Sequence, residues 1–360
     1  MAAPILVGIY CDLADAAPSP SNLEPWLRRE VDLLIAAGRI DRPVEFRKAW
    51  GLGLPSATAA VVERAIRDLA AQEVLMIVGP AIGDNAMIAT PLADELRVPM
   101  INWSGAARAR SEWMFHLQVG SHEDEGGLIA RHFADLGCRR IGVAHDRSTM
   151  GRRYLEFFRA EAELLGLDEV ATVQLFPEAQ EAGAQADALL AARPDAILYL
   201  GLGLSTPALA HALAERGWTG PRAMNTSGLR GYDPEFAGLI DGWAYVDMHS
   251  DDNRTLATYL EATGRTGERV LYREAAGYDM GRLVAEGIAR APDLTRAGIR
   301  EGLEHITWLP AAEGREGTTM GFGVQDRGAL KGRYMVMRQW IDGKSRPTGR
   351  AGEEGARKVK

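Results

Sequence analysis

The stretch Val74-Leu-Met-Ile-Val78-Gly-Pro-Ala-Ile-Gly-Asp-Asn85 decides the fold class. A short run of β-type apolar residues ends at a glycine-containing turn, and residues 85–96 follow with the apolar spacing of an amphipathic helix. A second apolar run, residues 99–102, comes after that helix. This strand–helix–strand order predicts a parallel, doubly wound α/β sheet.

The same alternation continues on both sides of this stretch. Toward the N-terminus, strands are predicted at 5–10 and 44–50, with helices at 23–37 and 57–71. After a strand at 115–119 the pattern begins again, with helices at 123–136, 154–165, 182–192 and 207–216 and strands at 140–145, 170–175, 196–200 and 221–224. The chain is therefore predicted to hold two similar α/β units in tandem.

The later part of the chain does not begin a third sheet. Residues 242–248 are strand-like, and helices are then predicted at 253–263, 269–291 and 294–303. Helices without strands of their own need an existing sheet to cover, so we expect them on the first lobe, with a late strand at 334–340 in the second.

In this arrangement the chain is predicted to cross between the two lobes three times. The predicted N-terminal lobe comprises residues 1–119 and 249–326, and the predicted C-terminal lobe comprises residues 120–248 and 327–343. Residues 344–360 are rich in Gly, Arg and Glu and are predicted to form a disordered tail.

Composition excludes several classes of function. The 360 residues carry 41 basic and 49 acidic side chains, a net charge of -8, which argues against a nucleic-acid or anionic membrane partner. No apolar run approaches the roughly 18 residues of a membrane span. Cys11 and Cys138 lack the spacing of a metal site or a disulfide framework and are predicted to be free thiols. No export signal is visible at the start, so the protein is either cytoplasmic or has lost its signal peptide.

Ligands of open α/β sheets bind beyond the carboxyl ends of the strands, so the loops there are the candidates. The loop at 79–85 offers glycines and free N–H groups, although Asp84 or Asn85 could serve only as a helix N-cap. The loop at 101–106 offers a hydroxyl, an amide and an indole. The loops at 201–206 and 225–228 would contribute from the second lobe.

No catalytic motif accompanies these loops. The sequence lacks a GxSxG elbow, a phosphate-binding loop and an HExxH motif, and no candidate general base adjoins a nucleophile, so neither an enzyme nor a metal or cofactor is predicted. His122-Glu-Asp-Glu125 looks like a metal or acid/base cluster, but acidic residues favour a helix start, and we interpret it as a solvated face. His116, His145 and His249 lie near strand ends or lobe crossings and are interpreted as structural.

Across residues 5–343 the sequence resembles the type I periplasmic binding proteins, and within them the leucine/isoleucine/valine-binding branch that serves ABC importers. The motifs that carry the resemblance are residues 78–85, 98–102, 145–151, 194–201, 277–279, 321–332 and 340–343. The resemblance implies two flavodoxin-like lobes joined by three crossover strands. It also implies an extracytoplasmic protein, periplasmic or lipid-anchored, with a small-molecule solute and ABC permease subunits as partners.

The family's ligand contacts can be carried over by position. In the first lobe the resemblance places them on Gly83, Ser104, Gly105 and Ala106. In the second lobe two family tyrosines fall on Met150 and Gly203, and the acid that receives an ammonium group falls on Ser227. The full predicted set adds neighbouring or marginal positions and reads Gly83, Asp84, Asn85, Trp103, Ser104, Gly105, Ala106, Met150, Gly203, Ser227, Tyr272 and Tyr278. Met150 and Tyr278 could equally be core residues.

The positions at which this sequence differs from the family pattern define the expected solute. An ammonium group would lose its carboxylate partner at Ser227, and small residues in place of tyrosines leave a roomier, more apolar cleft. The hypothesis is a non-enzymatic receptor for a hydrophobic or aromatic carboxylate, amide or amino-acid-like solute, with hinge closure on binding. The alternative is a cytoplasmic ligand sensor of the same fold that regulates a partner protein.

Overall fold

The computed structural model describes residues 3–12, 23–232, 234–264 and 272–348. The chain divides into two compact units, the first made of Met1–Ser121 with Met248–Tyr334 and the second of His122–Asp247 with the described residues from Met335 onward. Residues 327–334 belong to the first unit, although the sequence analysis placed them in the second lobe. The reason is a strand pairing between β12 (Thr319–Met320) and β13 (Leu330–Lys331), which keeps this segment in the first unit.

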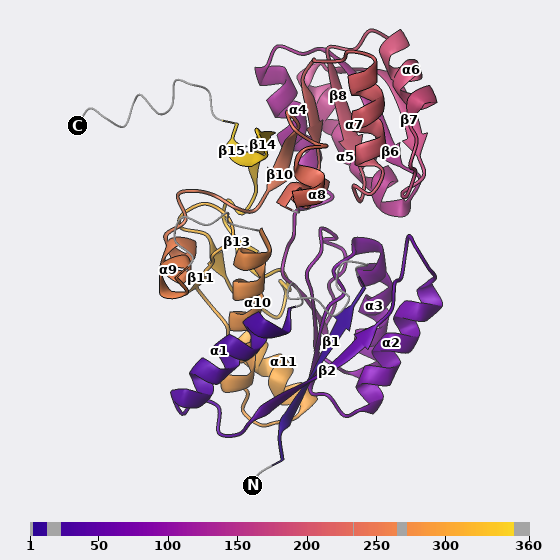
Figure 1. Ribbon diagram of the computed structural model, residues 1–360. Helices are drawn as coiled ribbons and strands as arrows, with labels where there is room; N and C mark the ends of the chain where they lie inside the picture. Colours follow the sequence, from indigo (N-terminus) through magenta and orange to yellow (C-terminus); the bar gives the residue numbers. More distant parts are fainter. Residues whose placement is uncertain (1–2, 13–22, 233, 265–271, 349–360) are drawn as a thin grey trace, which may run out of the picture. The chain divides into compact units, whose positions relative to one another are not determined.

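The first unit contains a five-stranded parallel sheet in the order β2-β1-β3-β4-β5 (Figure 1). Its strands are β1 (Ile5–Cys11), β2 (Val44–Trp50), β3 (Met76–Val78), β4 (Met100–Asn102) and β5 (Met114–His116). Ile9 pairs with Val78, and Val78 pairs with Ile101. The carboxyl ends of β1, β3 and β4 therefore meet at one edge of the sheet.

Helices cover both faces of this sheet (Figure 1). One face carries α2 (Ala59–Ala71) and α3 (Gly83–Leu96), and the other carries α1 (Glu24–Ala36), α10 (Tyr272–Ala289) and α11 (Arg296–Glu304). Strand alternation explains this arrangement, because Val7 and Ile9 join the core beneath α1 and α10 while Tyr10 joins the core beneath α2. The prediction that the late helices return to the first sheet is confirmed.

Smaller elements complete the first unit. They are α9 (Arg254–Ala262) and a three-stranded sheet of β11 (Leu309–Pro310), β12 and β13. The small sheet was not predicted, because strands of two residues are too short to show an alternating pattern.

The second unit repeats the strand order of the first and extends it. Its sheet has the order β15-β14-β10-β9-β8-β6-β7, in which β7-β6-β8-β9-β10 are parallel and β14 runs antiparallel to β10. The strands are β6 (Arg140–Asp146), β7 (Asp168–Leu175), β8 (Ala196–Leu200), β9 (Arg222–Met224), β10 (Ala244–Asp247), β14 (Val336–Ile341) and β15 (Lys344–Pro347). Both sheets therefore share the doubly wound order 2-1-3-4-5, which confirms the predicted α/β fold class.

Helix pairs again flank the sheet. In the second unit α4 (Glu125–Asp135) packs on α5 (Thr149–Leu165), and α6 (Gly183–Ala191) packs on α7 (Thr206–Glu215) (Figure 1). The 3₁₀ helix η2 (Thr226–Tyr232) and the short α8 (Pro234–Ala237) follow β9. Phe133 of α4 and Phe158 of α5 are fully buried against β6 and β8 and form the centre of this core.

The predicted disordered tail needs a correction. Residues 344–347 form β15, which pairs with β14 as a hairpin. The two-residue turn is Asp342-Gly343, both with positive φ (52° and 67°), which matches the right-handed twist of a hairpin. Residues 349–360 lie outside the described residues.

Candidate functional site

In the first unit the structure brings together the loops after β3 and β4. The 14-residue helix α3 begins at Gly83, and the N–H groups of its first turn have no acceptor within the helix. The Trp103 N–H donates to the Pro80 carbonyl at 3.1 Å, which holds the β4 loop against the β3 loop. The predicted residues Gly83–Asn85 and Trp103–Ala106 therefore form one group of neighbouring backbone and side chains.

Buried side chains organise these loops from behind. Asn85 accepts a hydrogen bond from the Leu54 N–H at 2.8 Å and donates to Asp12 at 2.9 Å. The Ser104 hydroxyl donates to the Asn102 amide oxygen at 2.9 Å. The Asn102 amide and the Ser104 hydroxyl, which the sequence analysis considered as ligand contacts, are thus engaged within the loops. The N-cap of α3 is Ile82, so the N-cap interpretation of Asp84 and Asn85 is wrong.

His116 is structural, as predicted. Its Nδ1 accepts from Arg110 Nε at 3.0 Å, because that guanidinium nitrogen can only donate. The other ring nitrogen is then the donor to the Ser104 carbonyl at 2.6 Å. The histidine therefore fixes the loop that follows β4.

Asp12 is an organising residue that the sequence analysis missed. It directly follows β1, is fully buried, and accepts from the Ala81 N–H at 2.8 Å and the Ile82 N–H at 3.0 Å. Burial raises the pKa of its carboxyl group, while these hydrogen bonds oppose the rise. The available signal was an acid placed immediately after an apolar strand.

The second unit gathers its candidate loops around Asp146, the last residue of β6. This carboxylate accepts from the Tyr199 hydroxyl at 2.7 Å, the Leu202 N–H at 2.6 Å and the Ser205 hydroxyl at 3.2 Å. Burial raises the pKa of Asp146, and its hydrogen bonds together with the Arg230 charge oppose the rise. The loop after β8 is therefore pinned to the end of β6.

The loops after β8 and β9 are joined in turn. The Asn225 side chain accepts from the Gly201 N–H at 3.1 Å and donates to the Gly201 carbonyl at 2.9 Å. Gly203 has φ +89°, and a β carbon placed on it would lie 2.8 Å from Cβ of Ser227. The structure thus brings the predicted residues Gly203 and Ser227 side by side.

Three predicted residues have other surroundings. Met150 lies in the first turn of α5 and packs in the core of the second unit. The Tyr278 ring stacks on Tyr259 with centroids 4.2 Å apart and lies against Arg282, so its ring contacts join α9 and α10. Tyr272 begins α10, and its side chain lies outside the described residues.

The His122–Glu125 segment is buried at two positions, so its interpretation as a solvated face is wrong there. Glu125 accepts from the Thr226 N–H at 2.7 Å and from the Tyr154 hydroxyl at 3.0 Å. The His122 ring lies 4.6 Å from the Tyr154 ring, and burial lowers the pKa of His122 to about 3. The physical reason is the loop after β9, whose N–H at Thr226 requires a buried acceptor.

Arg230 is a further residue that the sequence analysis missed, as it missed Asp146. It lies on η2, its Nε donates to the Leu202 carbonyl at 2.9 Å, and its side chain lies beside Gly203. The motif considered after β9 ended at Gly228, two residues short of this arginine. The available signal was an arginine in the segment that follows a predicted strand.

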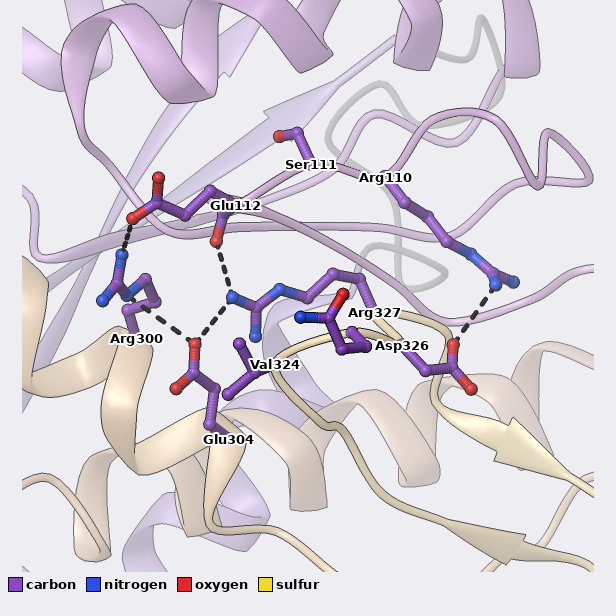
Figure 2. Close-up of a pocket in the computed structure, with 9 residues that line it drawn as sticks. Arg110, Ser111, Glu112, Arg300, Glu304, Val324, Asp326 and Arg327 are labelled. Carbon is purple, nitrogen blue, oxygen red and sulfur yellow. Dashed lines mark hydrogen bonds and ion pairs between the residues drawn. The ribbon is translucent and has the colours of Figure 1, made fainter.

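A separate cavity of about 480 Å³ lies at the amino end of β5 in the first unit, where Arg110–Glu112 precede that strand (Figure 2). Its charged groups neutralise one another. Arg327 binds Glu304 at 2.6 Å, Arg300 binds Glu112, and Arg110 lies 3.4 Å from Asp326. Buried donors remain at Nε of Arg300 and Arg327, but these atoms are almost inaccessible and cannot reach a molecule in the cavity. The charged side chains that line this cavity are therefore paired with one another.

The described part of the chain carries neither a cluster of metal-ligating side chains nor a membrane-spanning helix. No group of three or more His, Cys, Asp or Glu side chains there could hold a metal ion. None of the helices described is long and apolar enough to cross a membrane.

Known structures share this architecture over almost the whole chain. A type 1 periplasmic binding protein from Bordetella pertussis Tohama I matches with a TM-score of 0.80 at 17% identity, covering 97% of this chain and 100% of its own. The leucine-binding protein LivK from Thermotoga maritima gives a TM-score of 0.78 at 17% identity, with 96% and 98% covered. An ABC transporter substrate-binding protein from Desulfitobacterium hafniense, solved with Leu, gives 0.75 at 17% identity, with 96% and 100% covered.

Sequence comparison gives the family. No curated protein matches the sequence at a significant level. The family model described as periplasmic binding protein matches residues 55–344, which is most of the chain. Together with the two sheets of order 2-1-3-4-5, this match confirms the predicted resemblance. The chain belongs to the periplasmic binding protein family, a family of solute-binding proteins, and has the type I fold.

Proposed function

We propose that this chain is the extracytoplasmic solute-binding protein of an ABC importer. It binds a small organic solute, namely a hydrophobic or aromatic carboxylate, an amide or an amino-acid-like molecule, in the cleft between its lobes. Hinge closure on the solute creates the form that the permease subunits recognise. No chemical step is involved.

One observation carries the proposal: in each unit a buried aspartate holds the loops at the carboxyl ends of the strands. In the first unit Asp12 fixes the turn that opens α3. We assign the first N–H groups of that helix to a ligand carboxylate. In the second unit Asp146 fixes the loop that carries Gly203. Loops held in this way can bind a solute without losing their own structure.

Isothermal titration tests the proposal directly. Protein stripped of ligand by unfolding and refolding is titrated with a panel of benzoates, phenylacetates, aliphatic acids, their amides and the amino acids. At least one solute should bind with a Kd below about 100 µM, a free energy of about -5.5 kcal/mol. Silence across the panel, together with no copurifying solute by mass spectrometry, would contradict the proposal.

A pair of tryptophan variants locates the site. Trp103 is half-buried on the loop after β4, and Trp308 is 81% exposed before the small sheet. Trp103→Ala should weaken binding about tenfold or more, because aromatic residues dominate contact area in ligand sites. Trp308→Ala should leave the Kd within about twofold. Equal effects of the two variants would place the site elsewhere.

The alternative, a cytoplasmic sensor of the same fold, rests on the two free thiols Cys11 and Cys138. It predicts a ligand-dependent complex with a regulatory partner. Fractionation of native host cells that express the full-length gene separates the two hypotheses. The importer hypothesis expects the protein outside the cytoplasm, and the sensor hypothesis expects it in the cytoplasm.

A further inference from the structure

The 3₁₀ helix η2 presents two faces with different chemistry. With three residues per turn, positions i and i+3 lie above one another, so Gly228 and Gly231 share one face while Ser227 and Arg230 share another. Added β carbons at Gly228 and Gly231 would lie 2.3 Å from Tyr245 and Trp340, respectively. The Trp340 indole also donates to the Gly228 carbonyl at 2.9 Å. The glycine face is thus locked onto the sheet, which fixes the direction of the other face.

Arg230 is held on that other face with most of its donors unused. Its Nε donates to the Leu202 carbonyl at 2.9 Å, and its guanidinium carbon lies 5.7 Å from the centre of the Phe236 ring. A β carbon on Gly203 would lie 3.1 Å from Arg230 Cδ. In the described part of the chain the two Nη atoms have no hydrogen-bond or ion-pair partner, and the side chain is only partly buried.

Among the described residues, the carboxylate that interacts with the Arg230 charge is Asp146, and it is already committed. Asp146 is close enough to feel the Arg230 charge, but its two oxygens accept from Tyr199, Leu202 and Ser205. Position 227, on the same face as Arg230, is a serine whose hydroxyl donates to Asn225 at 2.8 Å. The surface made by Ser227, Arg230 and Gly203 therefore presents a positive charge with free planar donors. A carboxylate is the group that a guanidinium binds in bidentate fashion, whereas an ammonium would be repelled.

We infer that Arg230 makes this protein a receptor for solutes that carry a second carboxylate, with Arg230 binding that group at the loops of the second unit. This inference rests on the proposed function, since it names the class of solute that the same site takes. It predicts dicarboxylates in preference to monocarboxylates and to ω-amino acids of equal length.

Two series of matched probes test the preference by isothermal titration. The aliphatic series is adipate, hexanoate and 6-aminohexanoate, and the aromatic series is terephthalate, 4-methylbenzoate and 4-(aminomethyl)benzoate. In at least one series the dicarboxylate should bind about tenfold or more tightly than the monocarboxylate, and the ammonium compound should bind weakest. An ω-amino acid that binds as tightly as the dicarboxylate would overturn the inference.

Variants then assign the preference to Arg230. Arg230→Gln should reduce the dicarboxylate affinity about tenfold or more while changing the monocarboxylate affinity less than about threefold. Arg230→Lys keeps the charge and should retain part of the preference. The control is Arg131→Gln, which removes an exposed positive charge from α4 of the same unit and should leave all affinities unchanged. An unchanged preference in Arg230→Gln would overturn the inference.

A gain of function provides an independent test. The double variant Ser227→Asp with Arg230→Gln replaces the positive charge by a carboxylate on the same face of η2, and should bind 6-aminohexanoate more tightly than adipate. Circular dichroism and the melting temperature verify that each variant is folded. If the only solutes of the wider panel that bind are monocarboxylates, including amino acids without a side-chain carboxylate, the inference fails while the solute-binding function stands. If no solute binds at all, both fail.

Discussion

Asp12 and Asp146 occupy equivalent places in the two units and do similar work. Each lies at the carboxyl end of the strand second from the edge in the parallel order, β1 or β6. Each accepts one or more backbone N–H groups from the loop after the neighbouring strand in the sheet, β3 or β8. Their other partners differ, because Asp12 accepts from the Asn85 amide and Asp146 from two hydroxyl groups. The device that holds a loop is thus repeated, while the groups around it have diverged.

The two units differ in the chemical groups that their loops present to a ligand. Behind Asp12 the first unit offers the N–H groups of a helix start, which carry partial positive charge. Near Asp146 the second unit offers the full charge of Arg230. A common scaffold can therefore present different recognition groups once its loops are fixed by buried carboxylates.

Removing the carboxylates is expected to have the largest effect. Asp12→Ala leaves the N–H groups of Ala81 and Ile82 without their acceptor, and Asp146→Ala does the same to Leu202. Each buried unsatisfied group costs about 1–3 kcal/mol, so each variant should lose about 3 kcal/mol or more of unfolding free energy. Urea denaturation measures the loss.

Hydrogen exchange then tests whether the two aspartates act separately. Asp12→Ala should speed exchange in residues 79–86 and leave 199–205 unchanged, and Asp146→Ala should do the reverse. The exposed residues Asp68 and Asp135 provide matched Ala controls, one in each unit. If Asp12→Ala or Asp146→Ala had the unfolding free energy of wild type, the two aspartates would not share the role described here.

An intermediate effect is expected from crowding the glycine face of η2. In Gly228→Ala the new methyl group meets Tyr245 at 2.3 Å, which should cost about 1–3 kcal/mol and displace Ser227 and Arg230. Gly238→Ala adds the same methyl group with no heavy atom within 4 Å and should leave the melting temperature unchanged. If both variants melt at the same temperature, η2 is not held as rigidly as we describe.

The smallest effect concerns the pH dependence of stability and a buried histidine of the second unit, His122. His122 has a pKa lowered to about 3 by burial, with the Arg153 charge acting in the same direction. The folded protein keeps it neutral while the unfolded chain takes up a proton below about pH 6.5, so stability present above that pH is lost as pH falls. The unfolding free energy should drop by about 1–2 kcal/mol more between pH 7 and 5 in wild type than in His122→Phe. His211→Phe, at an exposed position, should follow wild type.

Most of the fold could be predicted from the sequence because its elements carry strong local patterns. The strand Val44–Trp50 was predicted with its observed bounds, and most helices differ only by a few residues at their ends. The β14–β15 hairpin was missed although Asp342-Gly343 is a strong turn signal, because residues 344–347 lack the alternating apolar pattern of a strand.

The candidate loops could also be predicted, but the use of their side chains could not. Asn85 meets Asp12 across 73 residues of sequence, and Glu125 meets the Thr226 N–H across 101 residues. Such pairs depend on the packed sheet, and no local pattern records them. For that reason Asn85 and Ser104 looked like ligand contacts, while Asp12 and Arg230 went unnoticed.

The last strand has a consequence for self-association. Among the described residues, β15 ends the second sheet with one side unpaired. An unpaired strand can template the addition of a strand from another molecule. Here that border carries exposed Lys344 and Arg346, whose charges repel an identical strand, and Pro347, which lacks an N–H to donate. Crowded copies of the chain should therefore resist joining sheet to sheet.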